Sequence, residues 1–239
     1  MPMAFQFKEF SINQDRCAMK VGTDGVLLGT WTPLENNPFS ILDIGSGTGL
    51  IALMLAQRSN AEQIDAIEID ENAYEQCVDN FENSNWSDRL FCYHASFQEF
   101  VGEVHEEDQY DLIVSNPPFY TAQFKSDNLQ RDLARFEDAL PFEHLLQGSS
   151  LLLSDEGIFC VIIPFSEEDN FISIANHFEL YPLKITRIKG NPTSEIKRSL
   201  IAFSKREIQV EIDELIIETS RHQYTEKYKN LTQDFYIKM

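Results

Sequence analysis

The feature that most constrains the fold is an apolar run, Ile41 to Ile44, which breaks into three alternating glycines and resumes as Leu50 to Leu55. This pattern predicts a buried strand, a turn too tight for side chains and then a helix. Gly45, Gly47 and Gly49 let the backbone approach a ligand closely, and the helix start offers unpaired N–H groups and a partial positive charge. The stretch therefore predicts a cofactor-binding turn.

The spacing of these glycines differs from the dinucleotide-binding fingerprint, in which the third glycine lies one residue further on. Asp43 also stands two residues before the first glycine. Because a carboxylate there would repel a pyrophosphate and attract a cation, the sequence favours a sulfonium-bearing cofactor over a dinucleotide. A second strand is expected from Ile64 to Ile69. Glu68, near its end, lies about 20 residues beyond the last glycine, where an acidic residue accepts hydrogen bonds from ribose hydroxyls.

A second motif, Asn116-Pro117-Pro118-Phe119, directly follows a strand expected from Tyr110 to Ser115, at the point where parallel α/β sheets bind their ligands. The two prolines fix the backbone and remove donors, so the Asn116 side-chain oxygen and the Pro117 carbonyl can both accept hydrogen bonds from one planar amine. Phe119 supplies a ring for stacking. Such a site would act by alignment and polarisation, without a strong base.

Together the two motifs resemble the class I methyltransferases, which use S-adenosyl-L-methionine (SAM). Those with an Asn-Pro-Pro motif modify planar amino groups: adenine N6, guanine N2, cytosine N4 or a glutamine amide. Further segments resemble the bacterial tRNA1(Val) (adenine-N6)-methyltransferases, which modify the adenine just 3′ of the anticodon. These segments are Phe5-x-Phe7-x-x-Phe10, residues 21–29, residues 113–119, Arg198 to Phe203 and the stretch that begins at Tyr224.

The resemblance implies one SAM-dependent domain, residues 1–239, with a seven-stranded, mostly parallel sheet and helices on both faces. Residues 1–36 would cover the cofactor site, residues 37–205 would form the catalytic core, and residues 206–239 would be a C-terminal extension. It also implies the site residues. SAM would be bound by Thr23, Asp24, Asp43, Gly45, Gly47, Gly49, Glu68, Ile69, Ser96, Phe97 and Asn116, and the catalytic residues would be Asn116, Pro117, Pro118 and Phe119.

The substrate is harder to infer, because 19 basic and 39 acidic residues give a net charge of −20, which argues against a polyanionic partner. Basic charge is nevertheless concentrated between residues 184 and 206, with seven basic residues and one acidic residue. We therefore expect tRNA contacts from Arg187, Lys189, Lys197 and Arg198. Lys125, Arg131 and Arg135 would contact phosphates beside the target base, although their mixture with acidic neighbours equally fits a solvated helix face.

Three departures from the family pattern stand out. Phe119 replaces the usual tyrosine, Ser96 stands where an acidic residue usually holds the adenine of SAM, and the chain is more acidic than its relatives. The Ser96 hydroxyl or the Phe97 backbone N–H could take over the adenine contact. A methyltransferase for glutamine amides or for guanine N2, and a non-catalytic module that keeps the fold, remain alternatives.

The remaining features of the sequence concern the cellular location of the protein and its other helices and strands. The four isolated cysteines predict free thiols and no metal site, and the N-terminus has no targeting signal, so we expect a cytoplasmic, monomeric protein. The remaining expected elements are a hairpin over residues 5–12, a helix capped by Thr23 or Asp24, a loop over 102–109, a helix over 137–153, a strand over 157–163, a helix over 171–178, an antiparallel pair over 182–188 and 196–203, and an edge strand over 208–217.

Overall fold

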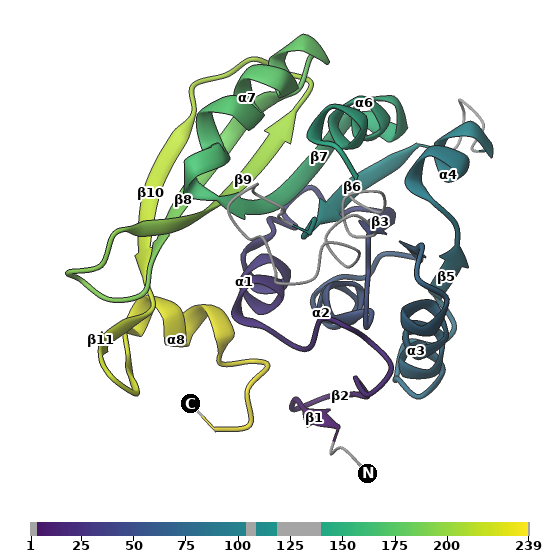
Figure 1. Ribbon diagram of the computed structural model, residues 1–239, viewed down its shortest axis with the longest axis horizontal. Helices are drawn as coiled ribbons and strands as arrows, with labels where there is room; N and C mark the ends of the chain where they lie inside the picture. Colours follow the sequence, from purple (N-terminus) through teal and green to yellow (C-terminus); the bar gives the residue numbers. More distant parts are fainter. Residues whose placement is uncertain (1–3, 104–108, 119–139, 239) are drawn as a thin grey trace, which may run out of the picture.

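The computed structural model describes residues 4–103, 109–118 and 140–238, and its centre is one eight-stranded sheet (Figure 1). The strand order is β10-β8-β9-β7-β6-β3-β4-β5, in which β9 runs antiparallel to both neighbours and the other pairs are parallel. The strands are β3 (Ser40–Ile44), β4 (Gln63–Glu68), β5 (Leu90–His94), β6 (Tyr110–Ser115), β7 (Leu153–Pro164), β8 (Tyr181–Lys189), β9 (Ile196–Ser204) and β10 (Glu211–Ile216). The expected antiparallel pair is confirmed. The sheet has one strand more than the expected seven, because β10 pairs along the outer edge of β8.

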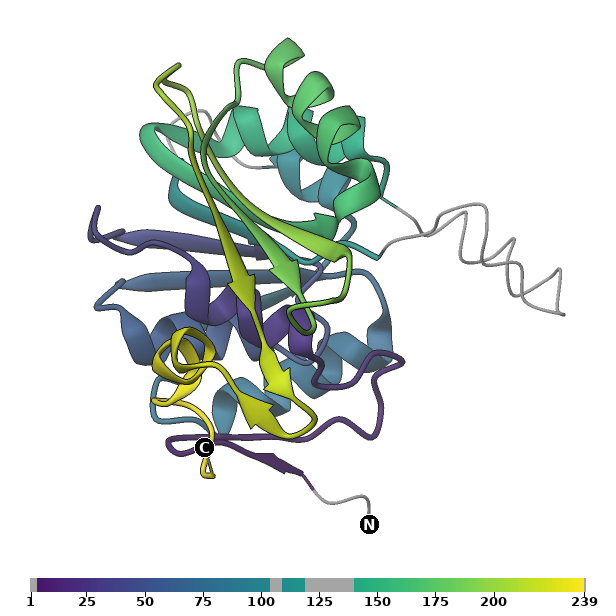
Figure 2. The same ribbon diagram turned by 90° about the vertical axis from the view of Figure 1, so that its left-hand side faces the viewer.

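Helices cover both faces of the sheet (Figures 1 and 2). On one face lie α1 (Thr23–Trp31), α2 (Leu50–Arg58), α3 (Glu71–Glu82) and α8 (Glu226–Thr232), and on the other α4 (Phe97–Glu103), α6 (Phe142–Leu152) and α7 (Glu168–His177). Because successive strand residues point to opposite faces, Ile41 packs in the first layer, whereas Leu42 and Ile44 pack in the second.

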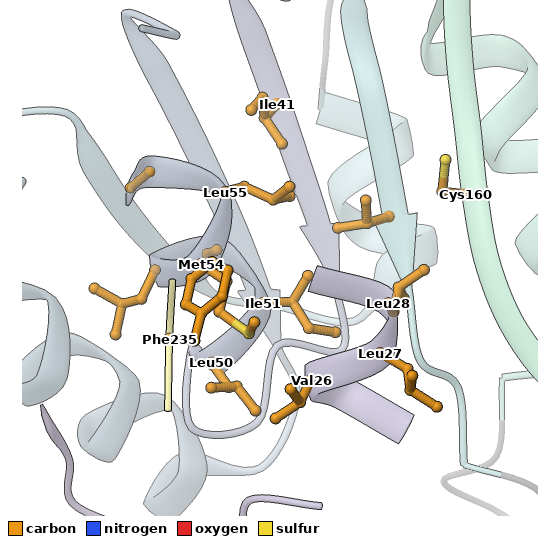
Figure 3. Packing of buried hydrophobic residues seen from close by; sticks show 14 of the residues in the cluster. Val26, Leu27, Leu28, Ile41, Leu50, Ile51, Met54, Leu55, Cys160 and Phe235 are labelled. Carbon is orange, nitrogen blue, oxygen red and sulfur yellow. The ribbon is translucent and has the colours of Figure 1, made fainter. Parts of the chain in front are cut away.

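Helix α1 packs closely against α2, where Figure 3 shows Val26 beside Leu50. Gly29 makes this approach possible, since a Cβ there would lie 2.7 Å from Met54 Sδ. The close packing fixes the N-terminal end of α1 beside the turn that begins α2.

The two ends of the chain meet on the α2 side of the molecule (Figure 2). The expected N-terminal hairpin is present as β1 (Phe5–Gln6) and β2 (Ser11–Ile12). Phe7 forms a bridge with Tyr236, and the Lys8 N–H donates to the Phe235 carbonyl at 2.9 Å. A small C-terminal ribbon, β11 (Glu218–Ser220) with β12 (Gln223–Tyr224), precedes α8.

Two local expectations are wrong. Helix α1 has Gly22 as its N-cap, with no side-chain cap, because Asp24 is engaged by Arg198 instead. Residues 102 and 103 of the loop expected over 102–109 belong instead to α4, which extends to Glu103. Residues 104–108, and residues 137–139 of the helix expected over 137–153, lie outside the described residues. No helix in the described part of the chain has the length and apolarity needed to span a membrane.

Candidate active site

A cleft opens where the strand order reverses, between the carboxyl ends of β3 and β6, which is where open α/β sheets bind ligands. The Ser115 hydroxyl donates to the Ile44 carbonyl at 3.0 Å and so joins the two strand ends. Two adjoining cavities, of about 520 and 390 Å³, occupy the cleft. They share the lining residues Met19, Gly45, Gly47, Asn116 and Pro118, so both predicted motifs border one continuous site.

The glycine turn has the predicted form. Gly45, Gly47 and Gly49 have φ angles of 71°, 55° and 77°, a region that other residues rarely adopt. A Cβ on Gly45 or Gly47 would meet nothing within 4 Å, so that side of the turn is open to the cleft. A Cβ on Gly49 would instead lie 2.5 Å from the Phe81 ring and 2.8 Å from Cys77 Sγ. Two glycines thus face the ligand, and the third allows packing on α3.

Glu68 lies at the end of β4 and lines the smaller cavity. Its Oε2 accepts the Gly47 N–H at 2.8 Å, and its Oε1 accepts the Asp70 N–H at 2.9 Å. These two bonds hold the carboxylate beside the glycine turn, and each oxygen keeps a lone pair for a hydroxyl. The predicted ribose acceptor is therefore in place. Asp70 also caps α3, since its Oδ1 accepts the Ala73 N–H.

The expectation for Asp43 needs correction. Its side chain is fully buried and lines neither cavity, so it does not face a sulfonium. Its Oδ2 accepts the Ala52 N–H at 3.1 Å in the first turn of α2, beneath the glycine turn. Burial raises the pKa of this carboxyl group to about 7, and the negative charge of Glu68 adds to the rise. Asp43 supports the loop rather than touching the ligand.

Ser96 is also used differently from the expectation. It lines the smaller cavity, but its hydroxyl donates to Glu99 Oε2 at 2.7 Å, and Glu99 also accepts the Ser96 N–H. This reciprocal arrangement is a capping box at the start of α4, and these bonds lower the pKa of Glu99. Ile69 and Phe97 line the same cavity and offer apolar surface to a flat ring. An adenine bound in this cavity would therefore meet its apolar walls and backbone.

The larger cavity is bordered by the start of α1. Thr23 and Asp24 both line it, as predicted for a segment that covers the cofactor. Asp24 Oδ2 accepts from Arg198 Nε at 2.8 Å, so the ion pair connects α1 with β9 at the mouth of the cleft. Arg198, expected to contact tRNA, is therefore next to Asn116 and is already anchored by a carboxylate.

The second motif emerges directly from β6. Asn116 is half-buried and borders both cavities, Pro117 is buried, and Pro118 is exposed at the rim. Phe119 lies outside the described residues, as do Lys125, Arg131 and Arg135. The described part of the motif places the Asn116 amide where the two halves of the cleft meet and Pro117 in the lining of the larger cavity.

Two of the expected tRNA contacts are paired with carboxylates of the protein. Arg187 Nη2 lies 2.7 Å from Glu168 Oε1, and Lys189 Nζ lies 2.8 Å from Glu214 Oε2. Glu168 is buried, and hydrogen bonding to it raises the pKa of Arg187. Like Arg198, these cations already have anionic partners, with which a phosphate would have to compete. Lys197 is exposed beside Arg198 at the start of β9.

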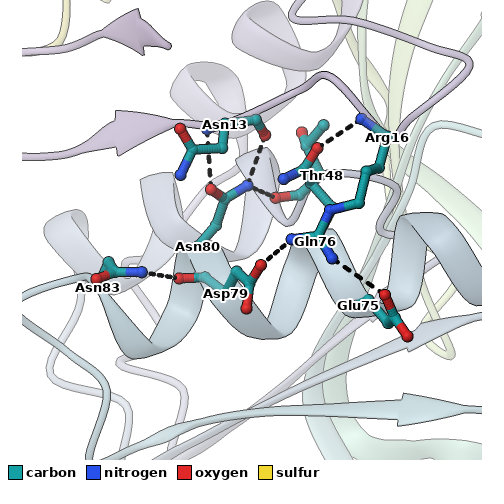
Figure 4. Close-up of polar contacts among 8 residues, drawn as sticks. All are labelled: Asn13, Arg16, Thr48, Glu75, Gln76, Asp79, Asn80 and Asn83. Atoms are coloured by element: carbon teal, nitrogen blue, oxygen red, sulfur yellow. Dashed lines mark hydrogen bonds and ion pairs between the residues drawn. The ribbon is translucent and has the colours of Figure 1, made fainter. Parts of the chain in front are cut away.

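Several lining residues were expected only as part of the segment that covers the cofactor site, residues 1–36, and not individually. Cys17, Ala18, Met19 and Lys20 border the cleft because the segment before α1 is tied down by α3 (Figure 4). Asn80 Nδ2 donates to the carbonyls of Asn13 and Thr48 at 2.9 and 2.8 Å, and its Oδ1 accepts the Asn13 N–H at 2.9 Å. These are contacts across 67 and 32 residues of sequence, which no local pattern encodes.

The residues present fit SAM. Cavities of a few hundred Å³ with apolar walls and a few convergent polar groups are typical ligand sites. Glu68 would hold the ribose hydroxyls, Ile69 and Phe97 would flank the adenine, and the turn at Gly45 and Gly47 would receive the methionine part. Within the described residues no cluster of three or more His, Cys, Asp or Glu side chains could hold a metal ion. The fold and this site define a class I SAM-dependent methyltransferase.

Comparison with known proteins gives the particular family. Residues 25–154 match the methyltransferase small domain. The tRNA1(Val) (adenine(37)-N6)-methyltransferase of Flavobacterium johnsoniae is 65% identical over 98% of this chain and 100% of its own length. The protein of the same name from Bacteroides fragilis is 46% identical over 98% of both chains. The chain belongs to the tRNA1(Val) (adenine(37)-N6)-methyltransferase family.

Solved structures agree on the fold. A predicted O-methyltransferase from Agrobacterium tumefaciens superposes with a TM-score of 0.68 at 19% identity, covering 89% of this chain and 96% of its own. A putative RNA methyltransferase from Pyrococcus horikoshii gives a TM-score of 0.52 at 17% identity, covering 77% of this chain and 82% of its own. At such identities these likenesses concern architecture alone.

Proposed function

We propose that this protein transfers the methyl group of SAM to N6 of adenine 37 in tRNA1(Val). The observation that carries the proposal is the position of Asn116 at the junction of the two cavities, directly after β6, with Pro117 in the lining of the larger cavity. One cavity suits the cofactor, and the junction presents two acceptors to an amine. The family relatives bear the same activity in their names.

The protein's part in the reaction is to align and polarise the amine. SAM, when bound, supplies an electrophilic methyl group on a sulfonium. The Asn116 Oδ1 and the Pro117 carbonyl accept the two N–H groups of the adenine N6 and orient its nitrogen toward the cofactor side of the cleft. Their partial negative charges stabilise the positive charge that develops on N6 as the bond forms. The rigid Pro117-Pro118 backbone keeps both acceptors in place.

The target base must leave its stack to reach this junction, as bases do in other enzymes that modify them. We propose that Arg198 and Lys197, at the rim of the cleft, contact the phosphates around the displaced nucleotide, together with Lys125, Arg131 and Arg135. The Asp24–Arg198 pair would hold the guanidinium ready at the rim. We further propose a monomeric, cytoplasmic protein that forms one domain, in which residues 1–36 cover the cofactor, 37–205 form the core and 206–239 extend it.

The test is transfer of labelled methyl from SAM into total tRNA from a strain that lacks this protein, followed by nucleoside digestion and chromatography. We expect the label in N6-methyladenosine. Label in N2-methylguanosine, or in a protein fraction rather than in tRNA, would keep the Asn116 chemistry and overturn the substrate.

A further inference from the structure

Beyond the cleft, the same edge of the sheet carries an unusually rigid arginine. Arg187 Nε lies 3.1 and 3.3 Å from the two carboxylate oxygens of Glu168, and Nη2 lies 2.7 Å from Oε1. Glu168 is only 2% exposed and also accepts a hydrogen bond from the Ser199 hydroxyl. A guanidinium held by such a fork keeps a fixed plane, because rotation would break several charge-assisted bonds.

This guanidinium lies over an aromatic ring. Its central carbon is 5.5 Å from the centroid of the Phe165 ring, and Phe165 itself is half-buried. Phe165 begins the 3-10 turn η1 (Phe165–Glu167), which directly follows β7. The Arg187 side chain is 34% exposed, so part of the pair is open to solvent. We call Phe165 and Arg187 the aromatic–guanidinium platform.

The register of the sheet places this platform at the same end of the sheet as the cleft, on the α7 face, whereas Arg198 points to the α1 face. Pro164, the residue before Phe165, is paired with Arg198, which lines the larger cavity together with Asn116. Arg187 is paired with Ser199, the next residue along β9. Since neighbouring strands are about 4.8 Å apart, the platform lies one to three strands from the end of β6. A nucleotide that flanks the displaced adenine would pass over this edge.

The charges around the platform favour a base over a phosphate. Arg187 is neutralised by Glu168, and Asp169 adds a further negative charge nearby. A phosphate would have to compete with these carboxylates. Stacking needs no net positive charge, and splayed-out RNA bases commonly stack on phenylalanine rings and on arginine planes.

We propose that the aromatic–guanidinium platform stacks a nucleobase that flanks the target adenine, and so helps to hold the tRNA with that adenine displaced. This inference rests on the proposed function, because it takes the substrate to be an RNA with an unstacked target. It assigns Phe165 a role that the sequence did not indicate, and it replaces phosphate contact by base stacking as the role of Arg187.

The test pairs changes in the protein with changes in the RNA. A set of full-length tRNA1(Val) molecules is prepared, each with a single abasic nucleotide at one of the two positions on either side of adenine 37. The Kd of each RNA is measured for the wild-type protein and for Phe165→Leu. At one position we expect base removal to weaken wild-type binding by about 5- to 100-fold, as for other base–aromatic stacks. The Phe165→Leu variant should bind all of these RNAs with the same, weaker affinity.

Matched variants separate stacking from stability and from charge. Phe165→Tyr keeps a ring and should keep the sensitivity to base removal, whereas Arg187→Lys keeps the charge but loses the plane and should reduce it. Phe91→Leu, an exposed phenylalanine on the far edge strand β5, is the control and should behave as wild type. Because stacking is weakly screened, the sensitivity should persist between low and moderate salt, while overall affinity falls.

Equal penalties for every abasic RNA in wild type, Phe165→Leu and Arg187→Lys would overturn the platform. If Phe165→Leu does not fold, as judged by thermal unfolding, the comparison of wild type with Arg187→Lys and Phe165→Tyr decides the question. Methyl transfer by the wild-type protein into unmodified tRNA1(Val) is measured alongside. Absence of that transfer would contradict the proposed function itself, and presence of transfer without any abasic sensitivity would contradict only the platform.

Discussion

At the scale of single residues, the proposed chemistry depends on Asn116, which would contact the target amine while other groups hold the cofactor. Replacing it by alanine should lower kcat by about 10²- to 10³-fold, the usual effect of removing one preorganised polar group from a reacting centre. SAM affinity should change little, because Glu68 and the glycine turn remain. Single-turnover methyl transfer and calorimetric SAM binding measure the two effects separately. An equal loss in both would refute the assigned role.

Asp43 controls stability rather than binding, and this gives a pH signature. Its pKa is raised from 3.8 to about 7, so the folded state binds this proton more tightly than the unfolded state does. The contribution is complete below about pH 4 and is lost as the pH rises through 7. Asp43→Asn removes this loss. Its free energy of unfolding, relative to wild type, should therefore rise between pH 4 and 7 by up to the order of 4 kcal/mol and then stay level.

Urea unfolding of both proteins at a series of pH values checks this. Because the other carboxylates are common to both proteins, their titration largely cancels in the difference. A difference that does not vary with pH would show that the Asp43 carboxyl ionises normally in the folded protein.

These residues show which features of the site can be predicted from the sequence and which cannot. Glu68 was predictable because its role follows from distance along the chain to the glycine turn. The prediction for Asp43 was wrong because the pattern gives the residue type but not the direction of its side chain. The carboxylate points beneath the glycine turn and accepts the Ala52 N–H. Ser96 was misread for a similar reason, since Glu99 three residues later competes for the hydroxyl. That capping-box spacing was visible in the sequence.

At the scale of elements, two glycines of the same turn have different roles: Gly47 borders the cleft, and Gly49 allows the turn to pack on α3. Gly49→Ala should destabilise the fold by about 2–5 kcal/mol, because its Cβ would collide with Phe81 and Cys77 at a φ of 77°. Gly47→Ala should cost only about 1–2 kcal/mol, since its Cβ enters open space. That Cβ would, however, stand in the cleft and weaken SAM binding. Thermal unfolding with and without SAM distinguishes the two, and equal destabilisation would contradict this division.

The segment before α1 depends on one buried amide, Asn80 (Figure 4). Asn80→Ala would leave the Asn13 N–H and two carbonyls without partners, which should cost about 1–3 kcal/mol and loosen the cover of the cleft. Asn83→Ala, one turn later on the exposed surface, removes only a bond to the Asp79 carbonyl and serves as the control. We expect weaker SAM binding for Asn80→Ala alone, measured by calorimetry. Identical SAM affinity in both variants would show that this anchor does not shape the site.

At the scale of the whole molecule, most of the architecture was predictable, because parallel strands, glycine turn and Asn-Pro-Pro motif all follow from short-range patterns. The eighth strand was expected as an edge strand, but its pairing with β8 was not, since nothing local specifies a partner. The basic residues between 184 and 206 looked like a tRNA surface. In the structure Arg187 and Lys189 are neutralised from α7 and β10, which are distant in sequence from each other.

The central claim is that the cleft of this fold, with Asn116, directs methyl transfer to N6 of adenine 37 in tRNA1(Val). The most direct measurement supplies the purified protein with labelled SAM and with transcripts of tRNA1(Val) that carry either adenine or guanine at position 37, and maps the product by nuclease digestion and mass spectrometry. The account predicts one methyl group per tRNA, on N6 of adenine 37, and none in the guanine transcript. Equal methylation of both transcripts, or methylation at another nucleotide, would contradict it.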